Sequence, residues 1–278
     1  MGRLLGDRYQ VVHPLWRDRL GETYVARDRK TGTPVTVRTL SGDLATAPVV
    51  GRFHTEHRRL TALRHPHLAG VLDLTVDHTG GDTVLAIVSE AAVGHTLRHH
   101  LRATGTPAPE EAVRVAADLA AGLHALHHAG LLLENLKPDN VVLTPDGRVQ
   151  LTDIALAHLV ADAPVARNRL RATVAEPAPE LLTGAAPTPA SDLFALGVLL
   201  QELTRHRWPT PLRRLVRQLR ARDPRARPTA HQARTRLLDG RADDEPHRWP
   251  VSVSASAMTA GRADPDPPMW SGSTPSPV

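Results

Sequence analysis

The chain has 278 residues, enough for one or two domains, and a hydrophobic content of 41%, enough for a sizeable core. It lacks both a run of about 18 apolar residues and a signal-peptide stretch at residues 1–9, so no membrane span is expected. Cysteine is absent, which excludes disulfides and thiolate metal sites. These features favour a cytoplasmic protein.

The formal net charge is +5, and among the 34 basic residues only Lys30 and Lys137 are lysines. A basic chain can bind nucleic acid. Alternatively, the arginines reflect a high-GC genome and solvated helix faces. Aromatic residues make up only 3% of the chain and do not alternate with the arginines as base stacking would require. We therefore expect no nucleic-acid partner.

Residues 8–90 are typical of a small sheet with one helix. Runs rich in β-branched and aromatic residues predict strands, and a helical pattern lies between them. A Lys-Thr-Gly-Thr turn within 28–33 separates two of the strands. The predicted strands are 9–12, 22–26, 34–38, 71–76 and 83–89, and the predicted helix is 48–63.

From residue 108 the pattern is mainly helical. A Pro-Asp-Gly turn at 145–147 joins two short apolar runs and predicts a hairpin. Thr229 follows a proline and is expected to be the N-cap of the last helix. The predicted helices are 110–128, 191–203, 212–219 and 229–238, and the predicted hairpin strands are 141–143 and 149–151.

Beyond Gly240 the composition shifts to Pro, Ser, Asp and Gly, which predicts a disordered tail over 240–278. Trp249 and Trp270 in this tail are either docking anchors for a partner or incidental.

Five short motifs follow one another in the helical half. They are 136–140 (LKPDN), 152–155 (TDIA), 178–180 (APE), 191–200 (SDLFALGVLL) and 222–229 (RDPRARPT). In this order they resemble the catalytic loop, the metal-binding motif, the A-P-E motif, the buried anchoring helix and the last motif of protein kinases. The resemblance extends over about 9–238 and is to the bacterial, actinobacterial-type Ser/Thr kinases.

The resemblance implies an α+β, two-lobed fold with a small β-rich N-lobe carrying one helix and a larger helical C-lobe. We expect the N-lobe at 1–90 and the C-lobe at 91–239. It also implies that an arginine of the last motif pairs with Glu180.

The chain departs from the family first in the glycine-rich turn, whose backbone amides approach the ATP phosphates. Trp16 and Asp18 stand where the first two glycines belong, and only Gly21 remains. Asp18 would place a carboxylate near the triphosphate, and Gly21 is either a remnant of the phosphate loop or an ordinary turn glycine.

The strand lysine that binds phosphates is also replaced, by Arg38. A planar guanidinium does not substitute freely for a compact ammonium. Glu56 stands where the partner glutamate belongs, so the resemblance implies an Arg38–Glu56 pair; the alternative for Glu56 is a solvated helix charge.

In the catalytic loop, Asn135 takes the place of the aspartate that orients the substrate hydroxyl, and a base there contributes about 10²–10⁴-fold. Glu134 replaces the arginine that grips a phosphorylated activation loop. Residues 153–172 contain no Ser, Thr or Tyr to accept a regulatory phosphate. Thr173 aligns with the threonine that bridges the catalytic loop and the substrate pocket.

Other site residues survive. Lys137 matches the position that meets the γ-phosphate, and Asn140 and Asp153 match the two magnesium ligands. Ser89 matches the gatekeeper position, with a small side chain, and Glu90 matches the hinge between the lobes. Val142 is also expected at the nucleotide site, whereas Thr23 and Thr36 replace apolar residues that usually cover adenine.

These residues predict a pseudokinase: a regulatory or scaffolding protein that binds an unidentified protein partner and binds ATP with Mg²⁺ weakly or not at all. The alternative is a Ser/Thr kinase of low activity that transfers the γ-phosphate to proteins. A nucleic-acid-binding module rests on net charge alone. A histidine metal site on 124–128 lacks a carboxylate at ligand spacing.

Overall fold

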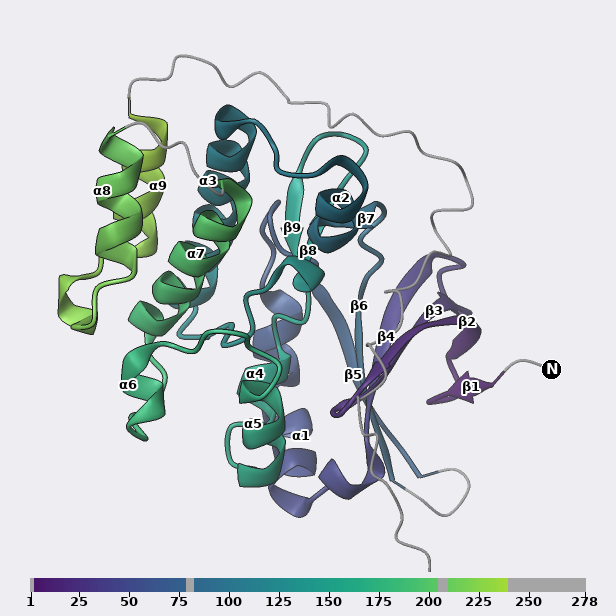
Figure 1. Cartoon of the computed structure of the whole chain (residues 1–278). Coiled ribbons are helices and arrows are strands. Elements are labelled where there is room, and N and C mark those ends of the chain that lie inside the picture. Colours follow the sequence, from purple (N-terminus) through teal and green to yellow (C-terminus); the bar gives the residue numbers. More distant parts are fainter. Residues whose placement is uncertain (1–2, 79–82, 205–209, 240–278) are drawn as a thin grey trace, which may run out of the picture.

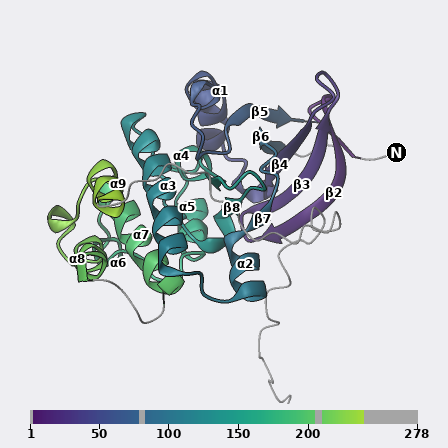
Figure 2. The same ribbon diagram turned by 90° about the horizontal axis from the view of Figure 1, so that it is seen from above.

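The computed structural model describes residues 3–78, 83–204 and 210–239 (Figure 1). The predicted tail over 240–278, with Trp249 and Trp270, lies outside these residues. The described residues form a sheet with one long helix against it and a larger, mostly helical part beside them (Figures 1 and 2). The expected two-lobed α+β fold is confirmed, while the boundary at residue 90 stays a prediction.

The N-terminal part is a six-stranded antiparallel sheet in the order β1-β2-β3-β4-β6-β5. All five predicted strands are present, and the first runs further than predicted, because β2 continues to Asp18 and turns directly into β3. The strands are β1 (Leu4–Leu5), β2 (Tyr9–Asp18), β3 (Gly21–Asp28), β4 (Pro34–Leu40), β5 (Val71–Asp77) and β6 (Val84–Glu90).

One helix, α1 (Ala47–Ala62), packs beside β5, as the pattern over 48–63 predicts. The short 3₁₀ turn η1 (Gly42–Leu44) precedes it. Val49, Phe53 and Leu60 lie on one face of α1 and are buried, which is the spacing that turns a helix face toward a core.

The C-terminal part is built around α3, whose apolar face is buried along its whole length. The predicted helices and hairpin are present, and Thr229 caps α9 by accepting a hydrogen bond from the Gln232 amide (3.2 Å). The larger helices are α2 (Leu97–Thr104), α3 (Pro109–His128), α5 (Pro164–Arg171), α7 (Pro189–Thr204), α8 (Thr210–Leu219) and α9 (Ala230–Leu238).

Shorter elements connect these helices. A three-stranded sheet in the order β7-β8-β9 lies beside α2, and single helical turns lie in the loops before β8 and after β9. These elements are β7 (His95–Thr96), η2 (Pro138–Asn140), β8 (Val141–Leu143), β9 (Val149–Leu151), α4 (Leu156–Leu159), α6 (Pro179–Leu182) and η3 (Pro224–Ala226).

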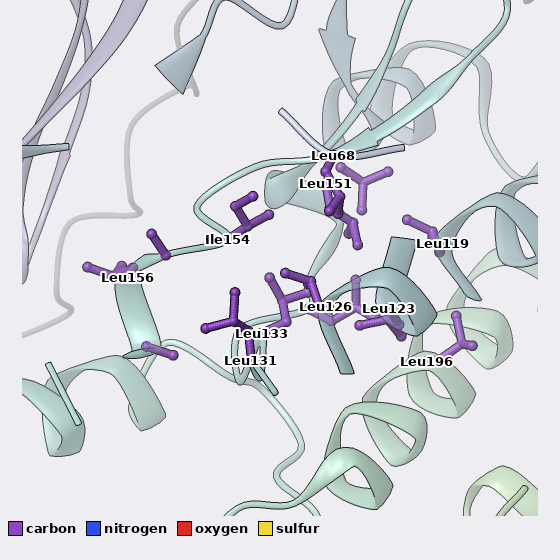
Figure 3. Close-up of a cluster of buried hydrophobic side chains, with 14 of the residues drawn as sticks. Leu68, Leu119, Leu123, Leu126, Leu131, Leu133, Leu151, Ile154, Leu156 and Leu196 are labelled. Atoms are coloured by element: carbon purple, nitrogen blue, oxygen red, sulfur yellow. The ribbon is translucent and has the colours of Figure 1, made fainter. Parts of the chain in front are cut away.

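A buried leucine-rich cluster holds the catalytic-loop region in place (Figure 3). It joins side chains of α3, the segment after α3, strand β9, α4 and α7, together with Leu68 before β5. Since burying a leucine contributes roughly 1.5–3 kcal/mol, this cluster fixes the backbone on which the polar loop residues stand. Its labelled members are Leu68, Leu119, Leu123, Leu126, Leu131, Leu133, Leu151, Ile154, Leu156 and Leu196.

Candidate functional site

A cleft of about 410 Å³ lies between the sheet and the helical part. Five of the predicted site residues line it, from both lobes. Its remaining lining is largely apolar, with side chains from β2, β3, β6 and the segment after β9. The five predicted residues are Arg38, Ser89, Glu90, Val142 and Asp153.

Arg38 lies at the inner end of this cleft and is only 3% exposed. One terminal nitrogen, Nη2, donates to both carboxylate oxygens of Asp18, at 2.8 and 2.7 Å. The other, Nη1, lies 3.5 Å from Oδ2 of Asp153 and donates to the Thr23 hydroxyl (3.2 Å). Arg38 therefore lies between two carboxylates: that of Asp18, which replaces a glycine of the glycine-rich turn, and that of Asp153, which matches a magnesium ligand. We call Asp18, Arg38 and Asp153 the ion triad.

The contacts within the ion triad shift the pKa values of Asp18 and Arg38. Burial raises the pKa of Asp18, but the charge and hydrogen bonds of Arg38 outweigh it and hold that pKa below its usual value. The charge of Lys137 acts in the same direction. Burial lowers the pKa of Arg38, whereas Asp153 and Asp18 raise it, with a net upward shift. Asp18 and Arg38 therefore stay charged near neutral pH, because both shifts favour the ionised forms.

The predicted Arg38–Glu56 pair is wrong. The Glu56 carboxylate instead lies 2.9 Å from Nε2 of His158 and 3.3 Å from Nη1 of Arg59. His158 stands on α4, the turn that follows Asp153, and this turn packs against α1. Burial raises the pKa of Glu56, but His158 and Arg59 outweigh it and lower that pKa overall. Asp18 has replaced Glu56 as the partner of the strand arginine.

Gly21 is held by strand geometry. Its φ is +150°, and a Cβ there would lie 1.9 Å from the backbone oxygen of Thr39. Only glycine fits so close an approach of two strands. It is absent from the lining of the cleft, and a contact of its backbone amide with phosphate stays a prediction.

The catalytic-loop residues form a buried hydrogen-bonded group next to the cleft. Oδ1 of Asn135 accepts a hydrogen bond from the Thr173 hydroxyl (3.0 Å), and its backbone oxygen accepts one from Nδ2 of Asn140 (3.0 Å). The predicted bridge from Thr173 to the catalytic loop is thus present. Lys137 stands between Asn135 and Asn140 in the chain, close enough to Asp18 to act on its titration.

Glu134 faces an arginine of the helix α5. Its carboxylate lies 3.4 Å from Nη2 of Arg167. Burial raises the pKa of Glu134, although Arg167 opposes this. The position at which the family has a phosphate-binding arginine is therefore occupied by an acidic residue, Glu134, whose carboxylate already pairs with Arg167.

Glu90 and Thr36 line the cleft, whereas Thr23 does not. Glu90 lines the cleft, and its carboxylate also accepts a hydrogen bond from the Gly70 amide (3.1 Å). Thr36 lines the cleft next to its cross-strand neighbour Ser89. Thr23 is buried beneath Arg38 instead and does not line the cleft.

Two anchors of the helical part match the implied contacts. Arg227, with a fully buried side chain, donates two hydrogen bonds to the Glu180 carboxylate, at 2.6 and 2.7 Å. The carboxylate of Asp192 accepts hydrogen bonds from the backbone amides of Leu133 (3.0 Å) and Glu134 (2.9 Å). These anchors hold the catalytic loop and the A-P-E segment against the helices.

ATP and Mg²⁺ fit only half of this cleft. The apolar walls and the hydroxyls of Thr36 and Ser89 suit a heterocyclic base. At the inner end, Arg38 is already neutralised by Asp18 and Asp153. A triphosphate would bring further negative charge beside the Asp18 carboxylate, so this arrangement does not fit the phosphates, and we derive no transfer step from it.

Comparison with known proteins agrees with the fold and the motifs. The protein kinase domain family model matches residues 9–213. The serine/threonine-protein kinase PkaB of Streptomyces coelicolor is 37% identical over 215 residues, covering 73% of this chain and 50% of the relative. The serine/threonine-protein kinase PknA of Mycobacterium tuberculosis is 31% identical over 202 residues, covering 72% of this chain and 47% of the relative.

The chain thus spans about half the length of these curated relatives. The crystal structure of the PknI kinase domain from Mycobacterium tuberculosis matches with a TM-score of 0.67 at 23% identity, covering 85% of this chain and 96% of that one. At this identity the likeness shows the fold alone. The family model covers most of the chain and the motifs follow in order, and the chain accordingly belongs to the protein kinase domain family, with actinobacterial serine/threonine kinases among its relatives.

Proposed function

We propose that this protein is a pseudokinase, a kinase-fold protein that regulates or scaffolds an unidentified protein partner and does not transfer phosphate. The observation that carries the proposal is the ion triad. Arg38 is bound by the chain's own carboxylates, Asp18 and Asp153, at 2.7 and 3.5 Å. Phosphoryl transfer depends on positive charge directed at the phosphates, and here that charge is already engaged.

Two further features support the proposal. Asn135 offers a neutral amide where a base is needed, and its Oδ1 is engaged by Thr173. Glu56 is held by His158 and Arg59 rather than by Arg38, so the ion pair that positions the phosphate-binding side chain in active kinases is not formed.

The test is a phosphotransfer assay of the purified chain with labelled ATP and Mg²⁺ or Mn²⁺, with and without a basic protein substrate. We expect no autophosphorylation and negligible transfer. The matched control is Asp153→Ala, which removes a metal-ligand position. Stoichiometric labelling of the wild type that disappears in this variant would overturn the proposal.

The second candidate is a low-activity Ser/Thr protein kinase. The names of the curated relatives favour it, as does the survival of Lys137, Asn140 and Asp153 at their motif positions. The same assay separates the two candidates, because a slow kinase gives labelling that increases with time and depends on Asp153.

Binding of ATP with Mg²⁺, if it occurs, is expected to be weak. Asp153 and Asn140 supply oxygen ligands of the kind that Mg²⁺ shares with phosphates, so the metal would be the main bridge to a triphosphate. A thermal shift reports such binding as RT ln(1 + [L]/Kd). We expect a small shift with millimolar ATP and Mg²⁺ that is lost with EDTA and in Asp153→Ala. An equal shift without metal would contradict this.

The partner and the location remain part of the proposal. Within the described ranges, no helix is long and apolar enough to cross a membrane. We propose a protein partner rather than nucleic acid, and action in the cytoplasm. An electrophoretic shift with DNA or RNA that persists at physiological salt would contradict the choice of a protein partner, since binding by charge alone weakens steeply with salt.

A further inference from the structure

The two ends of the cleft have different chemistry. Outside the ion triad the lining includes the apolar side chains Leu15, Val25 and Ile154, and also the charged residues Arg98, Arg102 and Asp139. Two hydroxyls, those of Thr36 and Ser89, stand side by side there on neighbouring strands. Such a surface suits a flat ring system whose edge carries hydrogen-bonding groups, because these groups can pair with the two half-buried hydroxyls.

The inner end already holds its own anion. Asp18 reaches Arg38 from the turn between β2 and β3, and the same Oδ1 atom accepts hydrogen bonds from the amides of Leu20 (2.9 Å) and Gly21 (3.2 Å). Its carboxylate therefore takes the cation and two backbone amides of the turn. These are the groups that a phosphate would otherwise use.

The formal charges at this end cancel. Arg38 and Lys137 give two positive charges, and Asp18 and Asp153 give two negative charges, so the sum is zero. A triphosphate entering here must either displace Asp18 from Arg38 or lie beside an uncompensated carboxylate. Both cost binding free energy, because like charges repel strongly in a partly buried site.

We propose that the cleft binds an uncharged, nucleoside-type heterocycle in preference to a nucleoside triphosphate, with the Asp18 carboxylate standing in for the phosphates. The proposal rests on the proposed function, because a protein that turns over ATP must accept its triphosphate at this end. It gives the cleft a ligand class and makes Asp18 the residue that selects it.

The experiment compares adenosine with ATP and Mg²⁺ on the full chain, by calorimetry and thermal shift, in wild type and Asp18→Asn. Asparagine keeps an oxygen to accept from the turn amides but removes the charge. Asp18→Gly is the second variant, in case the first folds poorly. The matched control is Asp146→Asn, which removes one carboxylate of an exposed hairpin pair with Arg148, away from the cleft.

In the wild type we expect adenosine to bind at least about tenfold more tightly than ATP with Mg²⁺. In Asp18→Asn we expect ATP affinity to rise by at least about tenfold while adenosine affinity stays within about twofold. Asp146→Asn should behave as the wild type. The ratio of the two affinities, rather than either alone, reports the role of Asp18.

Three results would overturn the inference: tighter binding of ATP than of adenosine by the wild type, an unchanged ratio in both Asp18 variants, or no binding of either compound. None of these depends on phosphotransfer. Labelled phosphate in the separate kinase assay would overturn the proposed function instead, so the two failures can be told apart.

Discussion

Restoring the catalytic base alone should not restore activity. Asn135→Asp is structurally conservative, because the side chain is nearly isosteric and a carboxylate accepts the Thr173 hydrogen bond as the amide does. If the base were the only defect, this change would recover about 10²–10⁴-fold in rate.

A second barrier remains in that variant. The Asp18 carboxylate lies against Arg38 at 2.7 Å, where phosphates would need the same cation. Two like charges about 4 Å apart interact by about 4 kcal/mol at an effective dielectric constant of 20. About 1.4 kcal/mol corresponds to a factor of ten. If the full repulsion acts at the transition state, Asp18 alone would therefore lower the transfer rate by roughly three orders of magnitude.

The assay measures labelled phosphate transferred to a basic protein substrate, for Asn135→Asp, Asp18→Gly and the double variant. We expect neither single variant to rise above the Asp153→Ala background. The double variant should exceed the sum of the two, because defects in one catalytic unit combine non-additively. A rate for Asn135→Asp alone close to that of ordinary kinases, about 1–100 s⁻¹, would refute the reasoning about the ion triad.

Four further outcomes concern stability and are measured by urea unfolding. Glu180→Ala should lower the free energy of unfolding by about 3–5 kcal/mol, because it leaves the buried Arg227 guanidinium without its anion. A decrease of less than about 1 kcal/mol would contradict the role of this ion pair as an anchor. The hydrogen bonds from Arg227 lower the pKa of Glu180 from its ordinary value of 4.5. The stability this provides is complete above that value and is lost as pH falls through the lower folded pKa, so Glu180→Gln should show a flatter decline below about pH 4.5. Gly21→Ala should lower the free energy of unfolding by about 2 kcal/mol or more, since the new Cβ would collide with the Thr39 backbone oxygen. Gly51→Ala, on the open face of α1, should instead raise it by about 0.5–1 kcal/mol.

The elements of the fold can largely be predicted from the sequence, because each carries its own local signal. The long helix over 110–128 has a continuous apolar face, and the hairpin has a Pro-Asp-Gly turn. The helices α2 and α5 were not predicted from the sequence. Each has only eight residues, LRHHLRAT and PVARNRLR, which is shorter than the window in which a helical period can be recognised.

The partners of the charged residues are harder to predict. Motif spacing correctly places Glu56 on α1 and Arg38 on β4, but it does not show which ion lies nearest. His158 belongs to a four-residue turn without a pattern of its own, and this turn brings it to Glu56. The sequence did suggest that Asp18 enters the phosphate region; its bidentate contact with Arg38 depends on β2 running straight into the turn before β3.

The backbone of the catalytic loop is held by a residue outside the loop, Asp192. Glu134 has a φ of +54°, a left-handed conformation that costs free energy for a residue with a side chain. Such strain persists only where the surroundings impose it. Asp192, 2% exposed, does so by accepting hydrogen bonds from the amides of Leu133 and Glu134, with Nε2 of His127 2.9 Å from the same carboxylate. None of these contacts to Asp192 involves the side chain of residue 134 or 135, so the shape of the loop alone is no evidence for catalysis.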